Sequence, residues 1–199
     1  MESAAAMWLD SAFAEFDQAI LGAIHQVQGS GADVVLGPLA EMLALIGKAG
    51  IGLILLGVVL LCFRRTRRYG AGVLAALAIG ALLTNVILKP LVARARPYAD
   101  ELGVFRQWWL EAGAAMESDR SFPSGHTTAA MAAMTAVFFL GDRRRTWAVF
   151  FLPLAMALSR LYLVVHYPTD VLAGLIVGFL AGALAAWLVR RCQDRRRAA

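Results

Sequence analysis

Five apolar stretches of this chain are separated by short charged segments. They are Tyr69 to Leu88, Ser121 to Gly141, Val171 to Val189, Thr146 to Val165 and Met42 to Phe63. The first three contain no Asp, Glu, Lys or Arg, and the last two contain one charge each, Arg160 and Lys48. Each is close to the ~20 residues that a helix needs to cross the hydrocarbon core of a bilayer. The pattern therefore predicts an all-α fold, a polytopic bundle of membrane-spanning helices.

The N-terminal segment has a different periodicity. Apolar residues recur at spacings of three and four with polar side chains opposite them: Leu9, Phe13, Phe16, Ile20, Ile24 and Val27 against Asp10, Glu15, Asp17 and Gln18. This predicts an amphipathic helix lying in the outer membrane interface. Residues 33–47 are also apolar, but Pro38, Glu41 and Gly47 argue against a separate span. We expect five spanning helices; a sixth across residues 33–47 would move the N-terminus inside.

Composition supports a membrane protein. The 199 residues are 60% hydrophobic and 17% charged, with a mean hydropathy of +0.65. Soluble domains are about a quarter charged, so a soluble globule, a disordered chain and a disulfide-stapled secreted scaffold are excluded. We expect residues 1–199 to form one integral membrane domain. The first 47 residues contain no Lys or Arg, so no signal peptide is expected.

The distribution of charge predicts the topology. Net charge is +5, and twelve of the nineteen Lys and Arg residues lie in three clusters, 64–68, 143–145 and 190–197. Each cluster adjoins the end of an apolar stretch, as positive-inside loops do. The clusters are therefore expected at the cytoplasmic face of the plasma membrane, near anionic lipids and not nucleic acid. The segment 89–121 and the turn 166–168 then fall on the outer side.

Cysteine and glycine positions add little about function. Cys62 and Cys192 adjoin basic clusters, and neither has a spacing typical of a disulfide or a metal site. Gly174, Gly178 and Gly182 recur every four residues. Such small-residue ladders allow close helix packing. We expect the ladder to pack within the bundle, but it serves dimerisation equally well, so the oligomeric state stays open.

Ionisable side chains gather at the outer ends of the predicted helices. They are Lys89, Arg94, Arg96, His126, Arg160, His166 and Asp170. Such residues are costly in a membrane and are functional candidates by default. Singly they could be snorkelling cations or hydrogen-bonded interfacial residues. Together, at one depth, they predict a site that binds an anion and performs proton or phosphoryl chemistry on it.

Two short motifs sharpen this prediction. Pro123-Ser124-Gly125-His126 starts an apolar helix, whose free N–H groups favour an anion; taken alone, ordinary capping explains it better. His166 and Asp170 are four residues apart. The carboxylate could accept from one imidazole nitrogen and leave the other as a nucleophile.

The same residues carry a resemblance to a known family. The chain reads Lys89-x6-Arg96-Pro97, then Pro123-Ser124-Gly125-His126, then Ser159-Arg160-x5-His166-x3-Asp170. In order and spacing these blocks resemble the signature of the type-2 phosphatidic acid phosphatase superfamily, which includes vanadium-dependent haloperoxidases. The matched region covers about residues 85–175. The membrane spans and short chain favour the lipid phosphatase branch over the soluble haloperoxidases.

The resemblance implies a role for each matched residue. Lys89, Arg96 and Arg160 would clamp the phosphate oxygens, with the Ser124 side chain and the Gly125 amide completing the cradle. His166 would be the nucleophile that forms a phosphohistidine, oriented by Asp170, and His126 would protonate the leaving oxygen and then activate water. No metal or cofactor is implied, because the cations already supply electrostatic stabilisation. Arg94 lies outside the signature and is expected to add only auxiliary charge.

The implied activity is hydrolysis of a lipid phosphate or diphosphate at the outer face of the plasma membrane. The outward site and small size are similar to undecaprenyl diphosphate phosphatases, which makes that lipid the first candidate. Phosphatidylglycerol phosphate and phosphatidate are alternatives. A lipid phosphotransferase using the same phosphohistidine, and a non-catalytic binder or transporter of anionic lipids, are alternatives of other classes.

Overall fold

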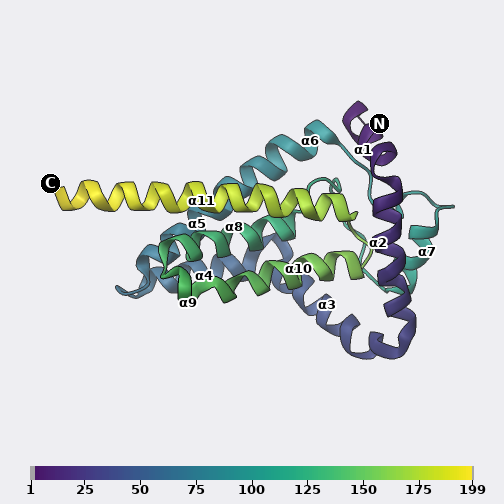
Figure 1. Cartoon of the computed structure of the whole chain (residues 1–199), viewed down its shortest axis with the longest axis horizontal. Coiled ribbons are helices and arrows are strands. Elements are labelled where there is room, and N and C mark those ends of the chain that lie inside the picture. The colour runs from purple at the N-terminus through teal and green to yellow at the C-terminus, as the bar shows by residue number, and fades with distance from the viewer. Residues whose placement is uncertain (1–2, 199) are drawn as a thin grey trace.

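A computed structural model describes residues 3–198, and the side chains of residues 3–195. The elements it describes are helical, as predicted. They are α1 (Ala4–Ala12), α2 (Ala14–Val27), α3 (Asp33–Gly47), α4 (Ile51–Cys62), α5 (Arg67–Ala81), α6 (Lys89–Val92), α7 (Val104–Glu111), α8 (Gly125–Leu140), α9 (Arg143–Thr146), α10 (Phe151–Tyr162) and α11 (Pro168–Ala198). Figure 1 shows α4, α5, α8, α10 and α11 running roughly along the long axis, with α2 and α7 crossing one end.

Shorter helical turns join several of these elements. Two are π-helical, Gln28–Ala32 between α2 and α3 and Leu82–Leu88 between α5 and α6. Three are 3-10 turns, Lys48–Gly50, Pro97–Ala99 and Trp147–Phe150. Because α5, the second π-helical turn and α6 follow one another directly, the predicted span Tyr69 to Leu88 forms one helical rod that continues to Val92.

Among the described residues, three helical stretches are long and apolar enough to cross a membrane. They are Ala14–Cys62, Arg67–Val92 and Pro168–Arg195, and Gly125–Leu140 is a shorter apolar helix. Large apolar side chains such as Leu55, Val59, Ile176 and Leu180 are exposed on α4 and α11. A lipid environment would cover such surfaces, which accords with a membrane protein. The number of spans stays a prediction.

The predicted span Met42 to Phe63 is not one unbroken helix. The chain breaks at Lys48–Gly50, where Ala49 and Gly50 adopt left-handed conformations with φ of 52° and 70°. Gly47 lies at the break, and a Cβ built there would lie 2.6 Å from Cδ2 of His126. Only glycine therefore lets α3 approach the start of α8 so closely, and the break sets that approach.

Helix α8 is the centre of the bundle and packs against α5, α10 and α11. Its inner positions are small, including the fully buried Ala132 and Ala136. The glycine ladder of α11 faces it: a Cβ at Gly178 would lie 2.6 Å from the Thr128 carbonyl oxygen, and one at Gly182 would lie 2.4 Å from that of Ala132. The ladder is thus used for packing within the bundle, as expected.

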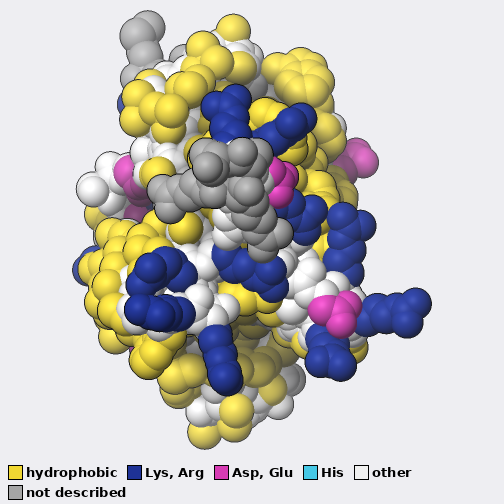
Figure 2. Space-filling view, turned by 90° about the vertical axis from the view of Figure 1, so that its left-hand side faces the viewer, with side chains coloured by type: hydrophobic (Ala, Val, Ile, Leu, Met, Phe, Trp, Pro, Cys, Tyr) yellow, Lys and Arg dark blue, Asp and Glu magenta, His cyan; other side chains and the backbone are white. Residues whose placement is uncertain are grey.

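The basic clusters lie at the end of the bundle opposite α2. That end carries the turn between α4 and α5, helix α9 and the end of α11 (Figure 1). Figure 2 views it directly and shows many Lys and Arg side chains with few acidic ones. The side chains of Arg196 and Arg197, counted in the third cluster, lie outside the described residues.

The N-terminal region is helical, but its faces are not as expected. Phe13 separates α1 from α2, and Phe13 and Phe16 are 36% and 41% exposed. Asp17, assigned above to the polar face, is buried with 2% exposure where α2 crosses the ends of α10 and α11. The amphipathic pattern misassigned it because a buried arginine, described below, requires a carboxylate there.

Candidate active site

Three cations of the predicted clamp come together at the end of the bundle that α2 crosses. Lys89 begins α6, Arg160 lies in the last turn of α10, and Arg96 follows a left-handed residue, Ala93 (φ 52°). All three are buried, with exposures of 7%, 1% and 5% in that order. Buried charges require partners of opposite sign, and the loop after α7 supplies them.

Glu117 bridges two of these cations. Its Oε2 lies 2.6 Å from Nη2 of Arg96, and its Oε1 lies 3.1 Å from Nη1 of Arg160. Nε and Nη2 of Arg160 are buried and have no hydrogen-bond partner among the described residues. The arginines therefore hold one carboxylate while donors of Arg160 remain unused.

Asp119 joins the third cation to the same group. Lys89 donates to its Oδ2, and Nη2 of Arg96 lies 2.5 Å from its Oδ1. Burial opposes ionisation of Asp119, but the hydrogen bond and charge of Lys89, with the charge of Arg96, lower its pKa to about 2. Burial likewise opposes ionisation of Glu117, yet Arg96 and the other nearby cations lower its pKa. Both carboxylates are therefore anions at neutral pH, seated among the cations.

His166 lies directly behind this ion cluster, in the turn between α10 and α11. Its Nε2 is 3.1 Å from Nη1 of Arg96, which also donates to the Val165 carbonyl at 2.7 Å. Because a guanidinium can only donate, Nε2 is the acceptor and the ring proton resides on Nδ1. Burial lowers the pKa of His166 well below its ordinary value, and the charge of Arg96 acts in the same direction. The imidazole is therefore neutral, with a lone pair on the side of the cations.

Asp170 lies on the other side of that ring. Its Oδ2 is 3.6 Å from Nδ1 of His166 and accepts from the backbone N–H of Tyr167 at 2.9 Å. The Ser121 hydroxyl donates to the same oxygen at 2.5 Å and lies 3.4 Å from Nδ1. Since Asp170 and Ser121 are fully buried, carboxylate and hydroxyl fix the edge of the imidazole that faces away from the cations.

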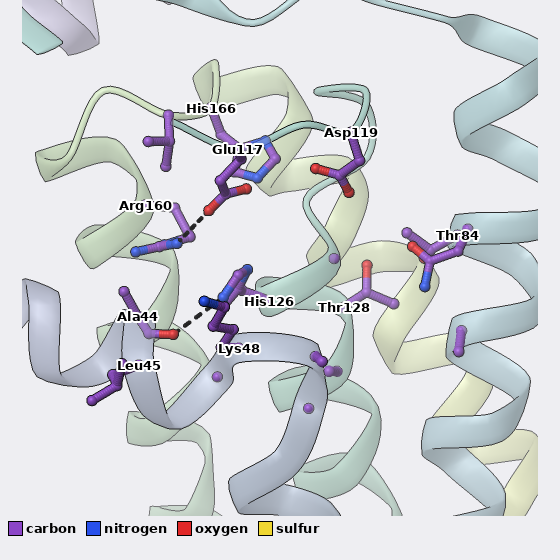
Figure 3. Close-up of a pocket in the computed structure, with 18 of the residues that line it drawn as sticks. Ala44, Leu45, Lys48, Thr84, Glu117, Asp119, His126, Thr128, Arg160 and His166 are labelled. Carbon is purple, nitrogen blue, oxygen red and sulfur yellow. Dashed lines mark hydrogen bonds and ion pairs between the residues drawn. The ribbon is translucent and has the colours of Figure 1, made fainter. Parts of the chain in front are cut away.

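His126 lies in the first turn of α8, against the break between α3 and α4. Its Nε2–H donates to the Ala44 carbonyl at 3.3 Å (Figure 3). Because that bond occupies Nε2, Nδ1 is the nitrogen available for proton exchange with a ligand. Both histidines line one cavity, together with Glu117 and Arg160.

The start of α8 contributes backbone, and Ser124 differs from the expectation. Gly125 lines the cavity, and a Cβ built on it would lie 3.6 Å from Nζ of Lys89. The hydroxyl of Ser124 is buried and pairs with Oγ1 of Thr127 at 3.0 Å. The Ser124 side chain therefore bonds within the first turn of α8, and no contact between it and the clamp cations is found among the described residues.

The cavity has a volume of about 1160 Å³ and extends from the histidines to α4 and α5. Its far wall is apolar, with Ile54, Leu74, Leu77 and Ala81. Lys48, at the helix break, also lines it near His126 (Figure 3). The backbone of Lys48 is hydrogen-bonded to Leu45 and Ile51, but its side-chain ammonium has no hydrogen bond or ion pair among the described residues, so this cation is free to meet a ligand.

The structure thus brings together seven of the eight residues predicted from the sequence, with Ser124 turned aside. Sequence reasoning missed Glu117, Asp119 and Ser121, because a charged outer loop gives no signal that it folds inward. It also underrated Arg94, which does not line the cavity but binds Oδ1 of Asp170 at 2.8 Å.

A helical membrane bundle with buried cations facing a neutral imidazole has the groups that could bind an oxyanion beside a nitrogen lone pair. The chain belongs to the PAP2 superfamily, whose family profile matches residues 69–194. A structure titled as a transmembrane PAP2 type phosphatidylglycerolphosphate phosphatase from Bacillus subtilis is 25% identical. The TM-score is 0.65, over 96% of this chain and 90% of that one. Aquifex aeolicus LpxE, 23% identical, gives the same TM-score over 84% and 92%, which shows the fold alone.

Two curated relatives carry more specific names. A lipid A 1-phosphatase of Rhizobium etli is 35% identical over 124 residues, which are 62% of this chain and 51% of that protein. Undecaprenyl-diphosphatase BcrC of Bacillus subtilis is 40% identical over 67 residues, 34% of each chain. The chain therefore spans about half, or less, of the length of these two relatives.

Proposed function

We propose that this protein is a membrane lipid phosphatase that acts through a phosphohistidine on His166. The proposal rests mainly on the position of Glu117. Its carboxylate is an anion bound by Arg96 and Arg160, and Nε2 of His166 lies 3.1 Å from Nη1 of the same Arg96. A carboxylate resembles one face of a phosphoryl group in charge and in its pair of acceptor oxygens. When Glu117 leaves, a phosphoryl group of the substrate takes the same position.

The first step forms one bond and breaks another. The lone pair of His166 Nε2 attacks phosphorus, and the bond from phosphorus to the leaving oxygen breaks, with its electrons going to that oxygen. Lys89, Arg96 and Arg160 neutralise the charge on the non-bridging oxygens in the transition state. The N–H groups at the start of α8 add the positive end of a helix dipole.

His126 manages the protons in both steps. Its imidazolium gives a proton to the leaving oxygen, and the neutral ring then takes one from a water molecule that attacks the phosphohistidine. As the water oxygen bonds to phosphorus, the bond from phosphorus to Nε2 breaks and its electron pair returns to Nε2, so that phosphate is released and His166 is neutral again. Asp170 holds the Nδ1 proton of His166 throughout and stabilises the positive charge that develops on the ring.

Lys48 favours a diphosphate over a monophosphate. It is a cation without a partner among the described residues, and it follows Gly47, which contacts the ring of His126. Because His126 protonates the leaving oxygen, Lys48 lies on the leaving-group side. A leaving group that is itself a lipid phosphate carries negative charge there, whereas a lipid alcohol does not. A prenyl diphosphate such as undecaprenyl diphosphate, the substrate named for the Bacillus relative, is therefore our first candidate.

We place the reaction at the outer face of the plasma membrane. The support is the positive-inside pattern, since the basic clusters lie at the end of the bundle opposite the cavity. The apolar wall on α4 and α5 gives a lipid tail a path along the bundle while the phosphate reaches the cations.

A substrate panel tests both parts of the proposal. The purified protein is assayed for phosphate release from a prenyl diphosphate, phosphatidylglycerol phosphate and phosphatidate, alongside Lys48→Met and the control Arg65→Met. We expect kcat/KM for the diphosphate to fall at least tenfold in Lys48→Met, with less than a threefold change for monophosphates and in the control. Equal losses on all substrates would remove the diphosphate preference, and no release from any of them would remove the phosphatase.

A further inference from the structure

Behind His166 lies a second ion cluster, of which only Asp170 belongs to the family motifs. Its centre is the guanidinium of Arg94, which is 1% exposed and donates to three carboxylates. Nε lies 2.7 Å from Asp10, Nη2 lies 2.9 Å from Asp17, and Nη1 lies 2.8 Å from Asp170. The guanidinium carbon also lies 3.8 Å from the centre of the Tyr167 ring. Every edge of this cation is therefore occupied, and Asp170 is one of its partners.

Arg94 holds the oxygen of Asp170 that does not face the imidazole. Oδ1 accepts from Arg94, whereas Oδ2 accepts from Ser121 and Tyr167 and faces Nδ1 of His166. A fully buried carboxylate without a cation would become protonated, because a bare charge is costly to bury. Arg94 therefore keeps the charge on Asp170 and fixes the orientation of its carboxylate plane.

Asp17 completes the arrangement from the N-terminal helix. Its Oδ2 accepts from Arg94 and from the Thr169 hydroxyl at 2.8 Å, and its Oδ1 accepts from the Thr169 backbone N–H at 3.0 Å. Thr169 precedes Asp170 in the first turn of α11, where free N–H groups favour a carboxylate. Asp17 thus ties α2 both to Arg94 and to the turn that carries Asp170.

We propose that Arg94 and Asp17 are positioning residues for the nucleophile, acting on His166 through Asp170. The chain of contacts runs from Asp17 on α2 through Arg94 and Asp170 to Nδ1 of His166, so the N-terminal helix is part of the catalytic apparatus. This inference rests on the proposed function, because it assigns His166 as the nucleophile. A positioning role differs from a purely structural one because the effect of replacing Asp17 then depends on whether the carboxylate of Asp170 is present.

A double-mutant cycle tests that dependence. Asp17→Asn keeps the size of the side chain and removes its charge, and it is combined with Asp170→Asn in the full-length protein. Glu15→Gln, at an exposed position of the same helix, is the matched control. Turnover of an aryl phosphate is measured as kcat and KM for each variant.

We expect Asp17→Asn to lower kcat at least tenfold and to change KM less than threefold. In the Asp170→Asn background the same substitution should change kcat less than twofold, and Glu15→Gln should change neither constant. An equal loss of kcat in both backgrounds, or a loss confined to KM, would overturn the proposal. Arg94→Lys, which keeps the charge but cannot reach three carboxylates, should lie between wild type and Asp170→Asn.

A readout without turnover separates this proposal from the proposed function. The ¹⁵N resonances of the His166 ring report which nitrogen carries the proton. Asp17→Asn should lower the fraction of His166 rings in the Nδ1–H tautomer, and Glu15→Gln should leave that fraction unchanged. If the wild-type protein releases no phosphate from any substrate, the proposed function fails, while this spectrum still decides the positioning. An unchanged tautomer in Asp17→Asn would overturn it.

Discussion

Nε2 of His166 lies 3.1 Å from Nη1 of Arg96, so the lone pair of the ring and the charge of the clamp face each other. The same contact, with burial, lowers the pKa of His166 well below its ordinary value. In the proposed mechanism a neutral ring attacks phosphorus, and a lowered pKa keeps the ring neutral as pH falls. The contact would then serve both the proposed nucleophile and the cation that binds the phosphoryl oxygens.

The protonation of His166 can be measured directly. In a His25→Gln, His126→Gln background the single remaining imidazole is followed by ¹⁵N NMR from pH 4 to pH 8. Because burial and Arg96 disfavour the imidazolium, we expect the neutral Nδ1–H tautomer to persist below pH 6, with a midpoint under the ordinary ~6.5. A midpoint at or above that value would contradict the assignment.

Glu117 and Asp119 occupy the clamp when no substrate is bound, so they compete with any incoming oxyanion. Glu117→Gln removes a negative charge that bridges Arg96 and Arg160. We expect orthovanadate to inhibit this variant about tenfold more strongly, equivalent to about 1.4 kcal/mol of binding free energy. Glu111→Gln, which alters an exposed carboxylate near Gln107, is the control. Weaker inhibition of Glu117→Gln would show that the carboxylate assists the oxyanion.

A substrate with a good leaving group distinguishes the roles proposed for His166 and His126. His166→Ala should abolish turnover and any covalent phosphoenzyme, because no nucleophile remains. His126→Ala should still be phosphorylated by an aryl phosphate, which needs little acid assistance. It should then accumulate an acid-labile, base-stable phosphoenzyme, since water is no longer activated. Phosphoenzyme in His166→Ala and none in His126→Ala would mean that the roles are reversed.

Metal independence follows from the clamp. In the proposed mechanism three cations neutralise the phosphoryl oxygens, so activity should survive an excess of chelator. Initial rates are compared with and without EDTA, and added Mg²⁺ or Zn²⁺ serves as the control. Loss of activity with chelator that either ion restores would contradict this mechanism.

Much of the site could be predicted from the sequence because its residues lie where helices end. Lys89, His126 and Arg160 stand out as charges or imidazoles beside apolar stretches, and the spacing from His166 to Asp170 is local. Glu117 and Asp119 could not be placed, because an acidic outer loop usually faces water. Only the folded chain shows that both carboxylates bind buried cations, with Glu117 largely covered and Asp119 still half exposed.

The prediction for the N-terminal region was wrong for a related reason. Periodicity describes which residues could share a helix face, but not which face meets the bundle. Asp17 looked like part of a solvated face, and its burial follows from Arg94, a residue 77 positions away. Likewise, the break at Lys48–Gly50 lies beside the close approach of Gly47 to His126, and its local signal is no stronger than two glycines.

The membrane orientation is tested with single cysteines in a background lacking Cys62 and Cys192. Leu102→Cys replaces a side chain that is 99% exposed in the outer loop, and Arg144→Cys lies in the basic helix α9. We expect an impermeant thiol reagent to label the first in whole cells and the second only after permeabilisation. The reverse pattern would place the cavity on the cytoplasmic side.

The cavity wall formed by Ile54, Leu74, Leu77 and Ala81 bears on how such an enzyme would respond to its surroundings. A lipid whose tail stays beside these residues never passes through bulk water, so its effective concentration is its mole fraction in the plane of the membrane. Adding inert lipid at constant total substrate would then slow the reaction, although the amount of substrate per volume is unchanged. The rate would depend on the mole fraction of the substrate among the membrane lipids, and therefore on the lipid composition of the membrane.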